Sequence, residues 1–242
     1  MSKFYVNIIL AFWFVSANAQ EWEDVSLEDF SKAILSVEER VPKGSSYGFE
    51  ADYYFFEQLV STDTTLALHT ELNYQYASKL LNMDQFGRLI VQTKDVQITC
   101  DTTYKQLILN DPNPEYTKRK GMEDFKLLLK SECTVQKMVK GKFEVYSILF
   151  AQGARYRGAE IWIEKEGMVS KYILHAGTPV LDDSGKEDKV IEPRLEVHFK
   201  NYVFGAQADK KKLIGDEEYF IDLKELKLQE KYKEFEIVDL RN

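Results

Sequence analysis

One segment of this sequence fits a catalytic motif. Gly44-Ser45-Ser46-Tyr47-Gly48 matches the pattern G-x-S-x-G, in which the central serine is the nucleophile of an esterase. That motif needs a strand before the serine and a helix after it. Here a helix pattern precedes the segment and a strand pattern follows it. The context therefore argues against an esterase.

The other residues that could do chemistry are scattered. His69, His175 and His198 stand singly on predicted strands, without the spacing to another His or Cys that a metal site requires. The acidic loop Asp182–Asp188 lacks the regular spacing of a calcium loop and contains a lysine. No nucleotide-binding motif is present. We predict no catalytic residues, no metal and no cofactor, and we do not expect an enzyme.

The N-terminus has the three regions of a secretory signal peptide in order. Lys3 supplies a positive charge, Phe4–Val15 is apolar except for Asn7, and small residues end at Ala19. The apolar run is too short to span a bilayer, and no later stretch approaches the 18 apolar residues that a membrane-spanning helix needs. We expect cleavage after Ala19 and an exported protein that is not an integral membrane protein. A buried N-terminal helix is the alternative.

The composition is that of a folded acidic protein. The chain has 242 residues, with 40 Asp or Glu, 32 Lys or Arg and a net charge of −8. This balance argues against a nucleic-acid partner, and 44% apolar residues argue against disorder. Residues 20–242 have the size of a single domain. Cys100 and Cys133 form either a disulfide or two separate thiols, and the sequence leaves both open.

Helical periodicity is confined to two segments. Ser26 and Asp29 have the spacing of a capping box, and apolar residues then recur every three or four positions until Pro42 and Gly44. This pattern predicts a helix over Leu27–Val41 that packs on a sheet. A second, short helix is predicted over Met122–Leu129.

From Ser46 onward the apolar period becomes two. Two long strands are predicted over Tyr47–Gln58 and Thr65–Ala77, each with one apolar and one polar face. Shorter strands follow, including Arg194–Phe204, and a charged tail begins at Asp216 and contains a last apolar alternation near Phe235–Val238. About ten strands joined by short hairpins predict a mainly β (α+β) protein built on a strongly curved antiparallel sheet.

The apolar positions of the two long strands are the candidate ligand-binding residues. A sheet of this size curls rather than staying flat, and two short helices cannot cover it. Its hollow side is then either a lipid-sized apolar surface with the helices as a lid, or a simply packed core. The candidate lining residues are Tyr47, Phe49, Tyr53, Phe55, Leu66, Leu68, Leu72 and Tyr74.

The order of these segments resembles the LolA-like and LolB-like family of outer-membrane lipoprotein carriers. The resemblance rests on the end of the signal peptide at Ala17-Asn18-Ala19, the helix, the two long strands, the meander Arg88–Asn110 and the late strand Pro193–Tyr202. It implies a half-barrel capped by helices, a periplasmic location, and a concave face that shelters acyl chains or a lipoprotein. By strand position, Arg88, Arg155 and Arg157 are candidates for the family's latch arginine.

Two functions from different classes remain open. The first is a non-enzymatic carrier, a single half-barrel domain over residues 20–242 with a charged C-terminal extension. The second is a structural accessory protein of an outer-membrane or secretion assembly, which uses its sheet edges for protein contact. The density of aromatic residues favours a ligand, whereas the charged tail after Asp216 favours a protein partner.

Overall fold

A computed structural model describes most of the chain. The described residues are 21–40, 44–56, 66–114, 133–151, 156–176, 180–181, 190–191, 193–214 and 220–241. The predicted signal peptide, the predicted helix Met122–Leu129 and the acidic loop Asp182–Asp188 lie outside them, so those predictions stay untested. Among the helices within these ranges, none is long and apolar enough to cross a membrane.

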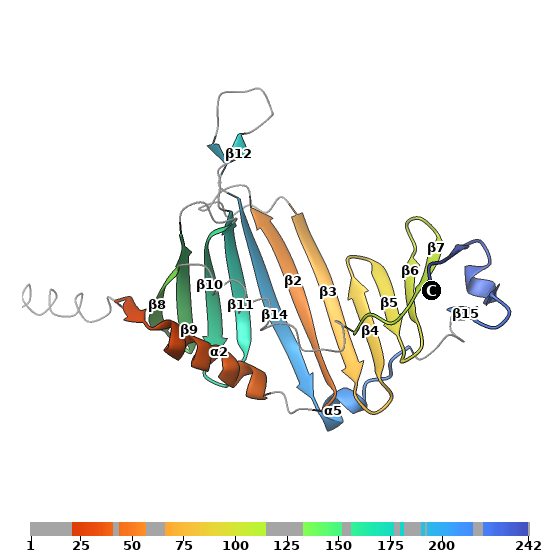
Figure 1. Ribbon diagram of the computed structural model, residues 1–242, viewed down its shortest axis with the longest axis horizontal. Helices are drawn as coiled ribbons and strands as arrows, with labels where there is room; N and C mark the ends of the chain where they lie inside the picture. Colours follow the sequence, from red (N-terminus) through yellow and green to blue (C-terminus); the bar gives the residue numbers. More distant parts are fainter. Residues whose placement is uncertain are drawn as a thin grey trace, which may run out of the picture.

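Thirteen strands form one open, curved sheet with β1 and β17 at its edges (Figure 1). Across the sheet the order is β1 (Glu23–Val25), β8 (Cys133–Lys140), β9 (Phe143–Phe150), β10 (Tyr156–Glu164), β11 (Val169–Ala176), β14 (Arg194–Phe204), β2 (Tyr47–Phe56), β3 (Leu66–Gln75), β4 (Leu80–Gln85), β5 (Arg88–Gln92), β6 (Gln97–Asp101), β7 (Gln106–Asn110) and β17 (Glu236–Asp239). Neighbouring strands are antiparallel, except that β17 runs parallel to β7.

The mainly β class and the curved sheet are therefore confirmed. The predicted number of strands was too low, partly because β1 is polar and lacks the alternating apolar pattern that predicts a strand. Two further pairs of short strands lie outside the main sheet: β12 (Val180–Leu181) with β13 (Val190–Ile191), and β15 (Ile221–Asp222) with β16 (Lys227–Leu228). The helical elements are α2 (Leu27–Arg40), α5 (Ala206–Asp209) and the 3₁₀ turn η1 (Glu230–Tyr232).

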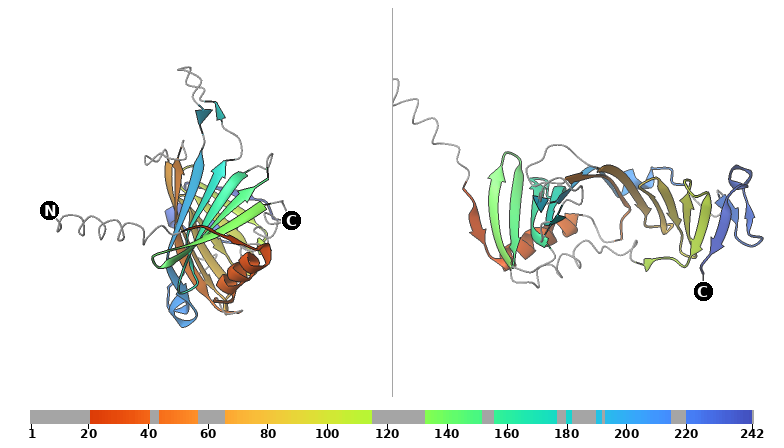
Figure 2. Two further views of the ribbon diagram at one scale, coloured as in Figure 1. Left: turned by 90° about the vertical axis from the view of Figure 1, so that its left-hand side faces the viewer. Right: turned by 90° about the horizontal axis from the view of Figure 1, so that it is seen from above.

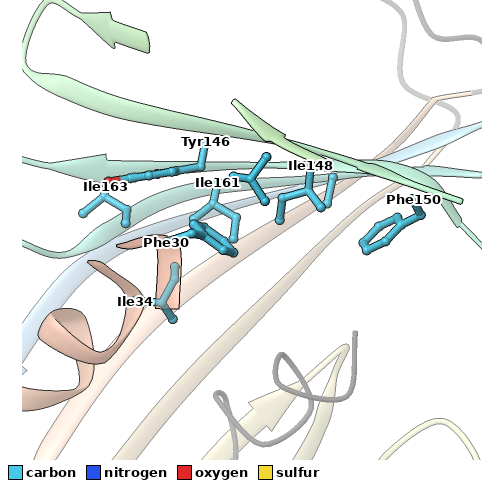
Figure 3. Packing of buried hydrophobic residues seen from close by; sticks show 9 residues of the cluster. Phe30, Ile34, Tyr146, Ile148, Phe150, Ile161 and Ile163 are labelled. Atoms are coloured by element: carbon cyan, nitrogen blue, oxygen red, sulfur yellow. The ribbon is translucent and has the colours of Figure 1, made fainter. Parts of the chain in front are cut away.

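Helix α2 begins and packs as its sequence predicts. The amide of Asp29 donates to the hydroxyl of Ser26 (3.1 Å), and that hydroxyl donates to the Asp29 carboxylate (2.7 Å). Phe30 and Ile34 then point from the helix onto the sheet (Figure 3). They form the helix core with residues of β8, β9 and β10, namely Val135, Tyr146, Ile148, Phe150, Ala159, Ile161 and Ile163.

A second core lies at the other end of the sheet and on its opposite face. Residues that pair across neighbouring strands point to the same side. Leu107 pairs with Cys100, and Cys100 pairs with Leu89. Leu89 pairs with Asp84, which pairs with Glu71 of β3. These residues therefore point to one side of the sheet, whereas Leu72, the next residue of β3, points to the other side. We call this the C-terminal core; its buried members are Val91, Val96, Ile98, Cys100, Leu107, Leu109, Phe220, Ile221 and Tyr232.

From Phe220 onward, the charged tail is thus part of the fold. Phe220 and Ile221 are fully buried in the C-terminal core, and β17 adds a strand beside β7. The apolar residues that lie between the charged ones are the residues that pack in the C-terminal core. Its charges therefore lie on the outside of a packed segment, and they give no support to a free extension that captures a partner.

The two cysteines are free thiols, so the disulfide alternative is not realised. Cys133 lies on β8, second in the sheet order, and Cys100 lies on β6, eleventh in that order. Strands are about 4.8 Å apart, whereas a disulfide needs Cα atoms within about 7 Å. Burial raises the pKa of both thiols.

Candidate functional site

The register of β2 against β3 brings the predicted lining residues together. Four cross-strand pairs account for all of them: Tyr47 with Tyr74, Phe49 with Leu72, Tyr53 with Leu68, and Phe55 with Leu66. Because paired residues point to the same side, these positions share one face of the sheet. The intervening residues of both strands point to the other face.

Helix α2 covers this same face of the sheet, at the end of the sheet near β8. Tyr53 pairs with Val197, Val197 with Tyr172, and Tyr172 with Ile161 of the helix core. Figure 2 shows the sheet arched, with α2 beneath its hollow side. We therefore call this side the concave face and the other the convex face.

Most of the lining candidates keep part of their surface accessible. Tyr47, Phe49, Tyr53, Phe55, Leu68 and Leu72 are half-buried. Tyr74 is buried in a small cluster with Leu81, Met83 and Ile90. The side chain of Leu66 lies outside the described part. The central concave face is therefore neither a closed core nor a fully exposed surface.

Strand β14 adds aromatic residues that the sequence analysis did not assign to the site. The ring of Phe49 contacts those of Phe199 (5.9 Å between centroids) and Tyr202 (6.0 Å), and Tyr202 stacks on Phe204 (6.1 Å). The alternation in Arg194–Phe204 showed that this strand has an apolar face. Its position beside β2 depends on pairing between residues far apart in sequence, and local patterns do not reveal that.

A turn contributes one more ring that was missed. Phe86 and Gly87 join β4 to β5 with positive φ angles of 57° and 82°. The Phe86 ring is 45% exposed and makes an edge contact with Tyr53, with 5.3 Å between centroids. This geometry places a large apolar side chain over the centre of the concave face.

The central concave face carries no charge at its paired positions. Across β10, β11, β14, β2, β3 and β4 these positions hold only apolar residues, tyrosines, Thr70 and Gln85. Burial raises the pKa of Tyr172 to about 12 and also raises the pKa values of Tyr53 and Tyr202. These phenols therefore stay neutral at physiological pH, and the face suits an uncharged, apolar ligand group.

The convex face of the same strands is charged. Asp52 accepts a hydrogen bond from Lys200 (2.5 Å) and contacts Nδ1 of His69 (2.7 Å), and both partners lower the pKa of its carboxyl. His198 lies beside them and contacts Glu196 (3.0 Å). His69 is exposed on this face, and His198 is half-buried. The charged side chains of the two long strands thus lie on the convex face, which also carries Tyr54 and the buried Phe56.

One of the candidate latch arginines reaches the concave face. Arg88 follows Phe86 and Gly87 and donates through Nε to the carboxylate of Asp101 (2.7 Å). Arg157 is exposed beside an irregularity between Tyr156 and Gly158, and Arg155 lies outside the described residues. Nothing in the described contacts assigns a latch role to any of them.

We expect replacement of Asp101 to weaken the acid dependence of stability. The amide of Tyr104 and the Arg88 guanidinium lower the pKa of Asp101 below its unfolded value of about 3.9. Its stabilising contribution is therefore complete above that unfolded value and is lost as the pH falls through the folded value. Asp101→Asn should be less stable than wild type at pH 7, and this difference should shrink toward pH 2. Thermal unfolding across this pH range tests it, and parallel curves would contradict it.

The serine of the G-x-S-x-G segment has a structural role. The Ser46 hydroxyl accepts the amide of Tyr76 (2.9 Å) and donates to the carboxylate of Asp209 in α5. It therefore ties the start of β2 to the helix after β14. Within the described residues, no group of three or more His, Cys, Asp and Glu side chains is arranged to hold a metal ion.

No family model matches the sequence, and no curated protein matches it. Solved structures are similar over most of the chain. An uncharacterized conserved protein from Thermus thermophilus is 12% identical, with 87% of this chain and 99% of that one covered and a TM-score of 0.40. A LolA superfamily protein from Nitrosomonas europaea is 8% identical, covering 78% and 98%, with a TM-score of 0.31.

A third solved structure, described as an outer membrane lipoprotein-sorting protein domain, comes from Vibrio parahaemolyticus. It is 9% identical, covering 73% of this chain and 92% of that one, with a TM-score of 0.27. The descriptions of two of these solved structures name the LolA superfamily and lipoprotein sorting. Because these TM-scores and identities are low, what those proteins bind does not transfer to this chain.

Proposed function

We propose that this protein is an exported, non-enzymatic carrier that binds lipid acyl chains on the concave face of its half-barrel sheet. One observation carries the proposal: the central strands present a half-buried, uncharged, aromatic-rich surface on the hollow side of the sheet. Such a surface is costly to leave in water. It fits a long apolar chain.

The energetics of this surface suit reversible binding. Each methylene that leaves water contributes about 0.8 kcal/mol, so a partly buried chain is held by contact alone. The rings of Phe49, Phe199 and Tyr202 offer large faces with few rotatable bonds, which limits the entropy lost on binding. Helix α2 covers the β8, β9 and β10 end of the sheet, and residues of β11 pack against the edge of the helix core.

We expect protein purified from its native host without detergent to carry lipid. Organic extraction followed by mass spectrometry should recover acyl-chain lipids in about equal molar amount to the protein, and delipidated protein should bind a fluorescent fatty acid. A protein that yields no lipid and binds no acyl probe would overturn the proposal. Stable recovery of a membrane complex instead of lipid would support the accessory-protein alternative.

A further inference from the structure

The uncharged part of the concave face ends at a charged residue on each side. Toward β8, Lys137 is bound to Glu144 (2.7 Å) and its side chain is only 27% exposed. Toward β5, Arg88 is also paired, to Asp101, but its side chain is 57% exposed. The two ends therefore differ: of these two described cations, Arg88 at the β5 end is the more accessible.

Arg88 is held in position from one side. Its partner Asp101 is almost fully buried and also accepts the amides of Thr103 (3.0 Å) and Tyr104 (3.1 Å), which fix the carboxylate. The Nε of Arg88 donates to this carboxylate, and no other hydrogen bond of the Arg88 side chain occurs among the described residues. The terminal nitrogens of a guanidinium oriented in this way are suited to a second carboxylate or phosphate.

The register places Arg88 in line with the apolar face. Arg88 pairs with Gln85, Gln85 with Thr70, and Thr70 with Ala51, which pairs with Phe199. Four strand spacings of about 4.8 Å separate β14 from β5, or roughly 19 Å. Beyond Arg88 the concave positions of β5, β6 and β7 become largely polar, with Gln92, Gln97, Thr99, Gln106 and Asn110.

We propose that the ligand is an anionic amphiphile with its head group at Arg88. Its acyl chain lies across β14, β2 and β3, and its carboxylate or phosphate binds the outer nitrogens of the guanidinium. Asp101 acts as a positioning residue that fixes the arginine. This inference rests on the proposed function, because it assigns an orientation and a head-group charge to the bound lipid.

The test compares head groups on one acyl chain. Delipidated wild-type protein is titrated with a fatty acid, a lysophosphatidic acid, a fatty alcohol and an alkyl trimethylammonium salt of equal chain length. We expect both anions to bind about tenfold or more tightly than the alcohol, and the cation to bind most weakly. Tighter binding of one anion tells a carboxylate from a phosphate ligand.

The variants separate a head-group role from a structural one. Arg88→Met should abolish the preference for anions and leave the affinity for the alcohol unchanged. Arg88→Lys should keep part of the preference for anions. Lys200→Met, which removes an ion-paired cation from the convex face, should keep the whole preference. Thermal unfolding checks that each variant is folded.

The possible failures are distinguishable. If none of the four amphiphiles binds, the proposed function itself fails. If all bind wild type equally, or if Arg88→Met weakens all of them equally, the acyl carrier stands and the assignment of Arg88 is wrong. The head-group comparison on wild type decides this even if an Arg88 variant does not fold.

Discussion

We expect Leu68→Glu to abolish the binding of acyl chains while the protein stays folded. Leu68 pairs with Tyr53 at the centre of the concave face and is half-buried, outside the buried clusters of the described residues. A carboxylate there keeps its hydration in the free protein but loses it under a bound chain, at a cost of several kcal/mol. We expect at least about a hundredfold loss of affinity, measured by fatty-acid titration, with a melting temperature close to that of wild type.

The neighbouring residue supplies the matched control. Ala67 is exposed on the convex face, where it pairs with Tyr54. Ala67→Glu introduces the same charge one position away but on the other side of the sheet, so its affinity should equal that of wild type. Equal affinity in both variants would show that the ligand binds elsewhere, and equal loss in both would point to a disturbed strand.

Phe30→Ala is expected to cause the largest loss of stability. Phe30 is fully buried between α2 and the sheet, with its ring 5.2 Å from that of Tyr146. Removing a buried phenylalanine ring costs about 3–5 kcal/mol, from lost burial and from the cavity left behind. Denaturant unfolding of wild type and variant measures this difference.

The same helix contains the control for that prediction. Leu35 follows Ile34 but is 39% exposed, so Leu35→Ala should cost no more than about 1 kcal/mol. Helix propensity favours alanine slightly, so any loss must come from side-chain contacts. Similar losses from both variants would contradict the assignment of Phe30 to the helix core. A small loss in Phe30→Ala would mean that α2 contributes little to holding the β8–β10 end together.

The sequence alone determined the local elements and the two faces of the central strands. The alternation in Tyr47–Phe56 and Leu66–Gln75 specifies which side chains share a side, since successive residues of a strand point in opposite directions. The two strands are close in sequence and pair with each other, so their apolar faces had to coincide. The capping residues and apolar stripe of α2 were equally local, and this element was predicted to within a residue at each end.

Only the tertiary structure decided how these elements are assembled. It placed β14 between β11 and β2, which brought Phe199 and Tyr202 to the site, and it put Cys100 and Cys133 on distant strands. It also packed the charged tail on the convex side and set Arg88 at the end of the apolar face. The positions of β14 and of the tail depend on pairing between residues more than a hundred positions apart, as in Tyr53 and Val197. Periodicity fixes the face of a strand, but only the competition among long-range pairings fixes its neighbours.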